Sequence, residues 1–444
     1  MNSLRILHLN DLHSHFENFP VIERFFAEKS EEATGDVLRF DLGDNVDRAH
    51  PLTEATAGRS NIELMNRLGL TAATIGNNEG LGLTHEMLSH LYDQANFDVL
   101  LSNLTNTPFG QGPKIIETSW GMKVGIIGLT APYDRAYPLA GWDLRYPMDV
   151  LEELLPLDCD FTILLSHLGK PRDEEIAERF PEIDLIIGSH THHLFEDGSK
   201  ANETLLAAAG RYGEHVGLID LDFEGNQLVD SRIHAYDTQL LPDLPGDKER
   251  VSAWEDEGHK LLQQVQFEAL EEGLTNTAPD YPASHYLAER FCEQKQVPAM
   301  LLASGLLVTD YLPAELDLDM LHDFLPHSIR LVKFTFTGDE LSQALAEITQ
   351  NASFMVNQTI QGMGFRGKVF GELILHNLTF EEGKASYLGQ PVEANETYEV
   401  LMPDQYLFAR YFPILKGLGH AEILFPDFLR ECFAHALKKK ENHA

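Results

Sequence analysis

Short apolar runs alternate with amphipathic stretches along the first half of the chain. Several runs are apolar on both faces, as is typical of strands covered by helices. The predicted strands are Leu4–Asn10, Val37–Leu42, Ala72–Ile75, Val99–Ser102, Lys123–Leu129, Phe161–Ser166 and Leu185–Gly188. The helices predicted between them are Val21–Lys29, Asn61–Leu68, His85–Asp93 and Asp173–Phe180. This alternation predicts a layered α/β sheet.

The alternation runs to about residue 235, and its last two predicted strands lie close together. Thr204–Ala209 and Val216–Phe223 follow one another closely, which predicts an antiparallel tail. A Pro/Gly-punctuated junction at Leu240–Asp247 precedes one long amphipathic helix, predicted over Lys248–Leu270. Beyond it, the chain mixes predicted helices (Ser284–Gln294, Gly338–Thr349) with predicted strands (Leu331–Phe336, Phe370–Phe380, Thr397–Met402).

The length of 444 residues exceeds what one compact core usually holds, so two domains are expected. The first is predicted to span residues 1–240 and the second residues 271–444. Residues 241–270 form the expected linker and bridging helix.

The charge balance is strongly acidic. The chain has 70 Asp and Glu residues and 33 Lys and Arg residues, which gives a net charge of −37. Such a surface repels polyanions, so neither a nucleic-acid polymer nor an anionic membrane is an expected partner. A small anion stays compatible, because bound metal ions reverse the field locally.

The cysteines and the N-terminus point to the cytoplasm. Cys159, Cys292 and Cys432 form no CxxC pair, so neither a disulfide framework nor a zinc knuckle is expected. The sequence begins without a signal-peptide pattern, and no apolar run approaches the roughly 20 residues of a membrane span. A monomer or a weak homodimer is expected.

Five polar motifs each follow a predicted strand. They are Asp11-Leu12-His13, Gly43-Asp44, Gly76-Asn77-Asn78-Glu79, Ser166-His167 and Ser189-His190-Thr191-His192-His193. Taken singly, each has an ordinary structural explanation, such as a turn, a helix cap or a satisfied polar residue. Residues just past separate strands of an open α/β sheet can meet in space, however. Five such coincidences in order favour one binuclear metal site.

The order DxH, GD, GN, H and HxH resembles the calcineurin-like metallophosphoesterase superfamily. The opening Leu7-His8-Leu9-Asn10-Asp11-Leu12-His13-Ser14-His15 is similar to the start of its bacterial 5′-nucleotidase and 2′,3′-cyclic-nucleotide phosphodiesterase family. The resemblance runs through the first domain and, more faintly, the second. It implies a four-layer sandwich of two mixed sheets flanked by helices, followed by a smaller α+β domain of the 5′-nucleotidase type.

The same resemblance implies two ligand sets. One divalent ion would take Asp11, His13, Asp44 and His192, and the other would take Asp44, Asn77, His167 and His190. Mixed oxygen and imidazole ligands suit Mn²⁺, Zn²⁺, Fe or Co²⁺, and the ligand types do not choose among them. Two such ions about 3.5–4 Å apart hold a bridging hydroxide that attacks a phosphoryl group in line.

The third motif departs from the family. GNN stands where the family has GNH, and Leu81 stands where the family has the Asp that pairs with that His. Asn78 retains a hydrogen-bond donor that can orient phosphoryl oxygens, but it cannot move a proton. His85 is the candidate replacement for that proton, with the first turn of a helix as its alternative place.

The second domain carries weaker signals. The Gly-rich segment Gly362–Lys368 includes Phe365, a candidate for stacking on a base, and Arg366, a candidate polar contact. Tyr411 is the candidate opposing face. The alternative for Phe365 and Tyr411 is packing within the domain.

These observations predict a metal-dependent phosphoester hydrolase that acts on a small nucleotide. The expected activity is that of a 5′-nucleotidase, a 2′,3′-cyclic-nucleotide phosphodiesterase or both. One alternative is a nucleotide-sugar or dinucleotide pyrophosphatase. An alternative of another class is a catalytically silent, metal-bound nucleotide sensor, which the missing His–Asp pair motivates.

Overall fold

The computed structural model describes residues 2–110, 112–360, 364–408 and 412–437. The chain divides into two compact units, Met1–His259 and Lys260–Ala444. The boundary falls within helix α9 (Asp247–Leu262), inside the segment predicted as the linker. No helix within the described ranges is long and apolar enough to cross a membrane.

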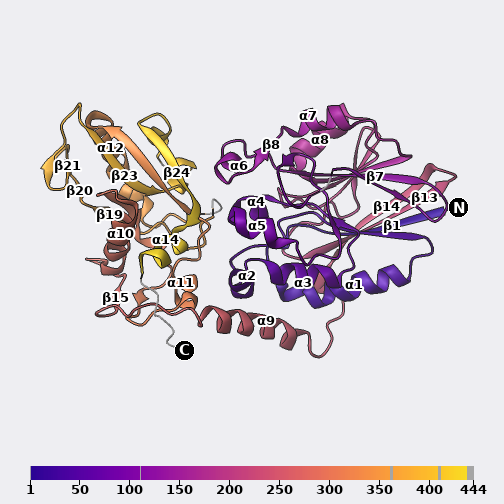
Figure 1. Ribbon diagram of the computed structural model, residues 1–444, viewed down its shortest axis with the longest axis horizontal. Helices are drawn as coiled ribbons and strands as arrows, with labels where there is room; N and C mark the ends of the chain where they lie inside the picture. Colours follow the sequence, from indigo (N-terminus) through magenta and orange to yellow (C-terminus); the bar gives the residue numbers. More distant parts are fainter. Residues whose placement is uncertain (1, 111, 361–363, 409–411, 438–444) are drawn as a thin grey trace. The chain divides into compact units, whose positions relative to one another are not determined.

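Two six-stranded sheets form the first unit (Figure 1). One has the order β14-β13-β1-β2-β3-β4 and the other the order β11-β12-β10-β9-β7-β6. The strands of the first sheet are β1 (Asn2–Leu9), β2 (Asp36–Asp41), β3 (Ala72–Ala73), β4 (Asp98–Val99), β13 (His215–Glu224) and β14 (Gln227–Asp237). Those of the second are β6 (Lys114–Glu117), β7 (Lys123–Thr130), β9 (Phe161–His167), β10 (Leu185–Gly188), β11 (Ser199–Ala201) and β12 (Thr204–Ala207). A small pair, β5 (Leu104–Thr105) and β8 (Asp143–Leu144), lies apart from both.

The two sheets pack face to face. One hydrophobic cluster contains Ile6 and Phe40 from the first sheet together with Ile126 and Ile163 from the second. The opposite face of the second sheet packs against helices, and β9 is buried along its whole length. The helices of this unit are α1 (Phe19–Glu31), α2 (Pro51–Thr56), α3 (Arg59–Arg67), α4 (Asn77–Gly82), α5 (His85–Leu91), α6 (Ala136–Leu139), α7 (Pro147–Leu154) and α8 (Lys170–Arg179). The result is the expected sandwich of mixed sheets flanked by helices.

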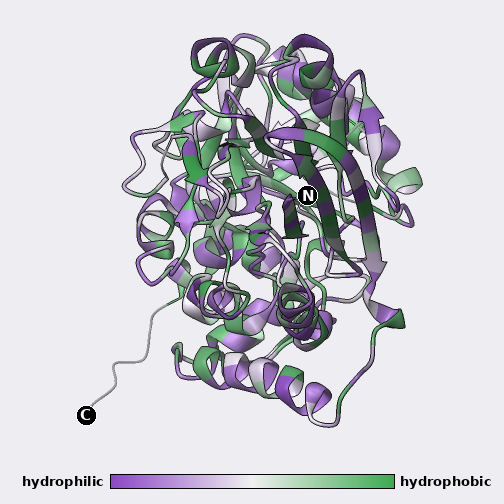
Figure 2. Ribbon diagram, turned by 90° about the vertical axis from the view of Figure 1, so that its right-hand side faces the viewer, coloured by the Kyte–Doolittle hydropathy of each residue, from purple (hydrophilic) through white to green (hydrophobic). Residues whose placement is uncertain are grey.

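The hydropathy pattern explains this layering. Figure 2 shows hydrophobic and hydrophilic residues alternating both along the strands near the N-terminus and along the helices. A strand that is apolar on both faces needs cover on both sides, and an amphipathic helix supplies cover with only one of its faces.

The second unit is a smaller α+β domain. Its main sheet has the order β19-β16-β23-β18-β24, and two minor sheets are β20-β21-β22 and β15-β17. The strands are β15 (Leu274–Thr275), β16 (Met300–Ala303), β17 (Tyr311–Leu312), β18 (Arg330–Thr337), β19 (Leu373–His376), β20 (Leu378–Glu381), β21 (Lys384–Tyr387), β22 (Gln390–Pro391), β23 (Thr397–Pro403) and β24 (His420–Phe428). The helices are α10 (Pro282–Lys295), α11 (Leu318–Phe324), α12 (Gly338–Met355), α13 (Gln405–Phe408) and α14 (Leu429–Ala436).

Three sequence predictions of local structure were wrong. The helix predicted over Lys248–Leu270 ends at Leu262, because the next residues pair with another segment: Phe267 N donates to Leu316 O at 3.0 Å. The strand predicted over Phe370–Phe380 is split into β19 and β20 at Asn377, whose φ of 58° lies in the left-handed region.

The third error concerns the predicted antiparallel tail. β13 pairs antiparallel with β1, as expected, but β12 pairs parallel with β10 and so continues the second sheet. The two runs therefore belong to different sheets. Their closeness in sequence gave no sign of this separation.

Candidate metal centre

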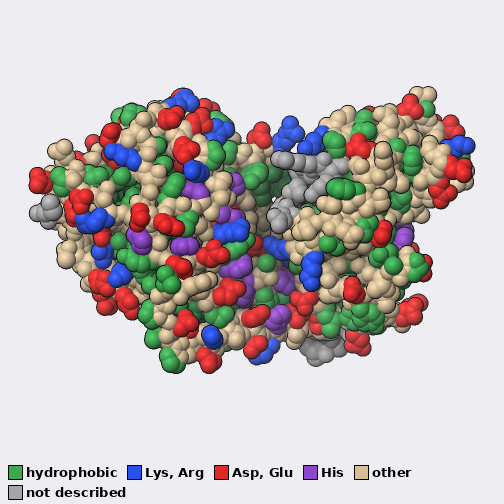
Figure 3. Space-filling model, turned by 180° about the vertical axis from the view of Figure 1, so that it is seen from behind, with side chains coloured by type: hydrophobic (Ala, Val, Ile, Leu, Met, Phe, Trp, Pro, Cys, Tyr) green, Lys and Arg blue, Asp and Glu red, His purple; other side chains and the backbone are tan. Residues whose placement is uncertain are grey.

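The predicted ligand loops follow the carboxyl ends of parallel strands. β1, β2 and β3 run parallel in one sheet, and β9 and β10 run parallel in the other. Backbone hydrogen bonds tie the loops together: Asp11 N donates to Gly43 O at 3.3 Å and His13 N to Asp44 O at 2.8 Å. His190 N donates to both carboxylate oxygens of Asp11 at 3.2 Å, which links the loops of the two sheets. Figure 3 shows histidine side chains grouped on one face of this unit.

One group of potential metal ligands consists of Asp11, His13 and His192. His13 Nε2 lies 4.0 Å from Asp11 Oδ1 and 3.2 Å from His192 Nε2. His192 Nε2 lies 3.8 Å from the same Asp11 oxygen. Ser189 Oγ donates to the other oxygen, Asp11 Oδ2, at 2.5 Å, which fixes the carboxylate. Three ligand atoms thus surround one point.

A second group consists of Asp44, His167 and His190. His167 Nδ1 donates to Leu42 O at 2.7 Å, which directs Nε2 at Asp44 Oδ2, 3.4 Å away. His167 Nε2, His190 Nδ1 and Asn77 Oδ1 are buried and have no hydrogen-bond partner within the described residues. Three buried polar atoms without a partner are costly, and all three are atoms that can bind a cation.

Asp44 connects the two groups. Its Oδ2 lies 3.7 Å from His13 Nε2 in the first group and 3.4 Å from His167 Nε2 in the second. Its Oδ1 accepts from Asn78 N at 2.7 Å. One carboxylate oxygen thus faces both groups while the other is held by the backbone, an orientation that suits a bridging ligand.

The backbone of the site is strained. Five of the seven predicted ligands have φ in the left-handed region, namely Asp11 (44°), His13 (49°), Asp44 (50°), His190 (72°) and His192 (54°). Such conformations are costly for residues other than glycine and persist only where the surroundings impose them. Five such residues in one cluster indicate that the position of their side chains is worth the conformational energy of the backbone.

Glu79 and Gly76 impose part of this geometry. The buried Glu79 carboxylate accepts from the backbone N–H of Asp44 at 2.9 Å, of Val46 at 2.8 Å and of Gly76 at 2.8 Å. A Cβ at Gly76 would lie 2.0 Å from Asp44 Oδ1, so only glycine fits beside that carboxylate. The first and last residues of the motif Gly76-Asn77-Asn78-Glu79 therefore both fix the conformation of the Asp44 loop.

The electrostatics of the cluster favour a positive charge inside it. Burial, reinforced by Asp44, raises the pKa of Asp11 to about 6. Burial lowers the pKa of His167, but the Asp44 carboxylate outweighs this and raises that pKa to about 10. Burial lowers the pKa of His190 and of His192 to about 4, and neighbouring imidazoles add to the effect. A proton on His167 thus takes the place that a divalent ion suits better.

Comparisons with known proteins decide the family. The calcineurin-like phosphoesterase family model matches residues 4–194. The chain is 32% identical to the uncharacterized metallophosphoesterase YunD of Bacillus subtilis, over 98% of this chain and 99% of that protein. The chain belongs to the calcineurin-like metallophosphoesterase family. It is therefore a phosphoester hydrolase of a family that binds a dinuclear centre of divalent ions.

Further relatives and solved structures carry 5′-nucleotidase names. A probable 5′-nucleotidase of Treponema pallidum is 29% identical over 44% of this chain and 38% of that protein. The structure of a putative 5′-nucleotidase from Staphylococcus aureus matches 98% of this metallophosphoesterase and 96% of that chain, with a TM-score of 0.65 and 14% identity. A 5′-nucleotidase precursor from Thermus thermophilus has the same coverages, with a TM-score of 0.59 and 20% identity. These two structures confirm the fold of both units.

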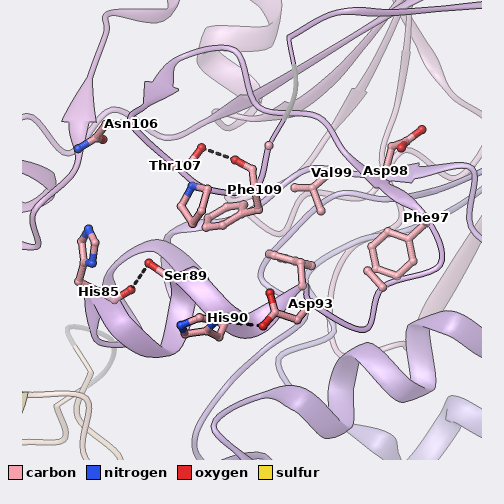
Figure 4. A pocket seen from close by; sticks show the side chains of 14 residues that line it. His85, Ser89, His90, Asp93, Phe97, Asp98, Val99, Asn106, Thr107 and Phe109 are labelled. Atoms are coloured by element: carbon pink, nitrogen blue, oxygen red, sulfur yellow. Dashed lines mark hydrogen bonds and ion pairs between the residues drawn. The ribbon is translucent and has the colours of Figure 1, made fainter.

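The metallophosphoesterase places its two candidate catalytic residues differently. Asn78 lies at the centre: its Nδ2 is 2.9 Å from His13 Nδ1 and donates to Asp47 Oδ2 at 3.4 Å. His85 is exposed at the start of α5 and stacks on Trp142, with ring centroids 4.0 Å apart. His85 lines a cavity of about 870 Å³. Figure 4 shows it there together with Ser89 and Phe109. That cavity contains none of the seven predicted ligands, so the structure does not bring His85 to them.

Two candidate substrate residues of the second unit, Phe365 and Arg366, lie in a packed segment. Phe365 is 8% exposed and stacks on His327, with ring centroids 4.9 Å apart. Arg366 Nη1 donates to Pro326 O at 2.6 Å, and Arg366 N donates to His327 Nδ1 at 3.0 Å. These contacts agree with packing within the domain, the alternative reading of Phe365. Tyr411 lies outside the described residues.

Sequence reasoning missed three residues at the centre. Glu79 stood inside a recognised motif, but an acidic residue in the first turn of a helix is too common to suggest a loop-shaping role. Arg211 and Tyr212 follow β12, and Tyr212 N donates to Asp11 O at 2.8 Å. The signal was present as Gly210-Arg211-Tyr212-Gly213, a glycine-flanked loop that follows a strand.

Proposed function

We propose that this metallophosphoesterase hydrolyses a phosphate ester of a small nucleotide at a two-metal centre. Asp11, His13, Asp44 and His192 would hold one divalent ion, and Asp44, Asn77, His167 and His190 would hold the other. The observation that carries the proposal is the position of Asp44 Oδ2, 3.7 Å from His13 Nε2 and 3.4 Å from His167 Nε2. The three buried polar atoms without a hydrogen-bond partner, His167 Nε2, His190 Nδ1 and Asn77 Oδ1, support it.

The donor set fits the ions that the family implies. Carboxylate, amide and imidazole ligands suit Mn²⁺, Zn²⁺, Fe or Co²⁺. When bound, such a pair lowers the pKa of water and polarises the phosphoryl oxygens, which are the two requirements for hydrolysis at neutral pH.

The residues of the chain hold this arrangement in place. Ser189 orients Asp11, the Leu42 carbonyl sets the tautomer of His167, and the backbone N–H of Asn78 holds one oxygen of Asp44. A ligand whose second ring nitrogen or second oxygen is already bonded keeps its orientation, which raises metal affinity. Asn78 is proposed to orient phosphoryl oxygens, whereas proton transfer by His85 stays a prediction from the sequence alone. The contacts of Asn78 favour its assignment, and those of His85 favour a structural role at the start of α5.

The nucleotide preference rests on the 5′-nucleotidase names of relatives that match part of the chain. A substrate panel tests it: 5′-AMP, 2′,3′-cyclic AMP, a nucleotide sugar and a dinucleotide, each with Mn²⁺, Zn²⁺, Fe²⁺ or Co²⁺. Turnover of 5′-AMP or 2′,3′-cyclic AMP is the expected result. Turnover of only the last two substrates would assign a pyrophosphatase. Tight nucleotide binding without turnover under every metal would assign a sensor and refute the proposal.

Two variants test whether the hydrolysis measured with the substrate panel takes place at the proposed metal centre. His167→Gln removes an imidazole that faces Asp44 and should abolish hydrolysis under every metal. His234→Gln changes an exposed histidine on β14 that pairs with Asp197, and should leave hydrolysis unchanged. Equal hydrolysis rates in the two variants would show that the reaction does not depend on His167.

A further inference from the structure

Arg211 borders the first ligand group. Its Nη1 lies 3.2 Å from His192 Nδ1, and its guanidinium carbon lies 4.5 Å from the centroid of the Tyr212 ring. The Tyr212 ring is in turn 5.6 Å from the His13 ring and 4.0 Å from the His15 ring, measured between centroids. An exposed cation thus stands one imidazole ring away from the proposed first metal position.

The loop that carries Arg211 is held in a strained conformation. Tyr212 has a φ of 59°, between Gly210 at 73° and Gly213 at 64°. The bond from Tyr212 N to Asp11 O fastens this loop to the first ligand loop. Strain of this kind in an aromatic residue beside a ligand cluster points to a functional constraint on where the loop lies.

The hydrogen bond between Arg211 and His192 conflicts with metal binding. Arginine has only donors, so His192 Nδ1 must accept and the ring hydrogen must sit on Nε2. Nε2 is, however, the nitrogen that faces His13 and Asp11. An ion bound there takes the lone pair of Nε2 and leaves the hydrogen on Nδ1. Two donors would then face each other, and the guanidinium would have to find another acceptor.

We propose that Arg211 is a substrate-contacting residue whose guanidinium turns from His192 to the phosphate of the substrate once the ions are bound. A guanidinium group can donate hydrogen bonds to two phosphate oxygens at once. Its contact with the Tyr212 ring can persist while it turns. In a chain with a net charge of −37, a cation at this position also offsets repulsion of an anionic substrate. This inference rests on the proposed phosphoester hydrolysis.

The test compares Arg211→Gln, Arg211→Lys and Arg211→Ala with the control Arg232→Ala, an exposed arginine of β14 that pairs with Asp222. Three quantities are measured for each: Mn²⁺ affinity of metal-free protein by calorimetry, the affinity of the Mn²⁺-loaded protein for inorganic phosphate, and kcat and KM for the best substrate of the panel. Glutamine keeps a donor without the charge, and lysine keeps the charge without the fork.

The expected result is a loss of about 10- to 100-fold in phosphate affinity and in kcat/KM for the Gln and Ala variants, with Lys in between. Mn²⁺ affinity should stay equal or rise, because a competing donor has been removed from His192. Arg232→Ala should match the wild type in all three quantities.

Two outcomes would overturn the inference. The first is unchanged phosphate affinity in all Arg211 variants. The second is weakened Mn²⁺ affinity with phosphate affinity restored at saturating Mn²⁺, which would make Arg211 a residue that only positions His192. Failure of the wild type to hydrolyse any phosphate ester would refute the proposed function instead, and phosphate binding by calorimetry would still decide the role of Arg211.

Discussion

His167 Nε2 lies 3.4 Å from Asp44 Oδ2, while its Nδ1 donates to the Leu42 carbonyl at 2.7 Å. The carbonyl fixes the ring so that Nε2 points at the carboxylate. A positive charge, either a proton on Nε2 or a metal ion beside it, is needed between these two groups. This arrangement ties β9 of one sheet to the loop after β2 of the other, so the sandwich itself sets the spacing of the two ligands.

Replacing Asp44 tests the bridging role. Asp44→Asn keeps the size of the side chain but removes the charge that faces both groups. We expect the bound metal to fall by at least one equivalent and kcat/KM to fall by more than about 100-fold, the upper end for partners that only orient ligands. Metal analysis and steady-state hydrolysis measure both. Asp93→Asn, at an exposed aspartate that bonds His90, is the control, and an equal loss in it would contradict the assignment.

Gly76, the residue that caps the start of α4, and Gly82, the last residue of α4, form a matched pair. A Cβ at Gly76 would collide with Asp44 Oδ1, whereas a Cβ at Gly82 meets nothing within 4 Å. Gly76→Ala should therefore displace Asp44 and abolish metal binding. Gly82→Ala should bind metal normally and gain about 0.5–1 kcal/mol of stability from its helical position. Normal metal content in Gly76→Ala would show that the Asp44 loop does not depend on this close approach.

Glu79 should stabilise the protein even without metal. Its carboxylate accepts hydrogen bonds from three backbone N–H groups. Glu79→Gln would place an amide donor opposite at least one of these N–H groups. We expect the free energy of unfolding of the metal-free first unit to fall by about 1–3 kcal/mol. Thermal melting of the metal-free protein measures this against Glu224→Gln, an exposed residue at the end of β13. Identical melting temperatures of Glu79→Gln and Glu224→Gln would show that Glu79 does not stabilise the loops of the site.

His327 should make the second unit sensitive to acid. Burial lowers the pKa of this imidazole to about 4, and its Nδ1 accepts from Arg366 N. Because the unfolded chain binds this proton more tightly, stability is full above about pH 6.5 and is lost as the pH falls toward 4. The loss amounts to about 3 kcal/mol.

Urea unfolding at pH 7.5 and pH 5 should show about 2 kcal/mol of that loss, because pH 5 still lies above the folded pKa. His327→Gln offers a donor and an acceptor but does not titrate, so the fall in stability between the two pH values should be smaller in the variant than in the wild type. A pH dependence as steep in the variant would show that other groups cause it.

The sequence predicted the metal centre better than the second unit, for physical reasons. Residues that follow buried parallel strands have positions fixed by the sheets, so the motifs at the strand ends and the family resemblance singled out Asp11, Asp44 and His167 as ligand candidates, and the structure brings them together. Glu79 and Arg211 act through hydrogen bonds to groups distant in sequence, and no local pattern encodes those bonds. Phe365 shows the opposite error: a Gly-rich segment suggested an exposed ring, but stacking on His327 buries it.

The pairing errors have the same origin. β12 joins β10 in parallel because the second sheet offers it an open edge, and the short gap before β13 gave no hint of a change of sheet. The helix after the junction ends at Leu262 because residues 314–318 compete for the next backbone groups. Both outcomes depend on partners far along the chain.

Anomalous X-ray scattering from crystals grown with Mn²⁺ tests the central claim most directly. The account predicts two peaks about 3.5–4 Å apart, one among Asp11, His13 and His192 and one among Asn77, His167 and His190, with Asp44 touching both. A single peak, or two peaks that do not share Asp44, would contradict it.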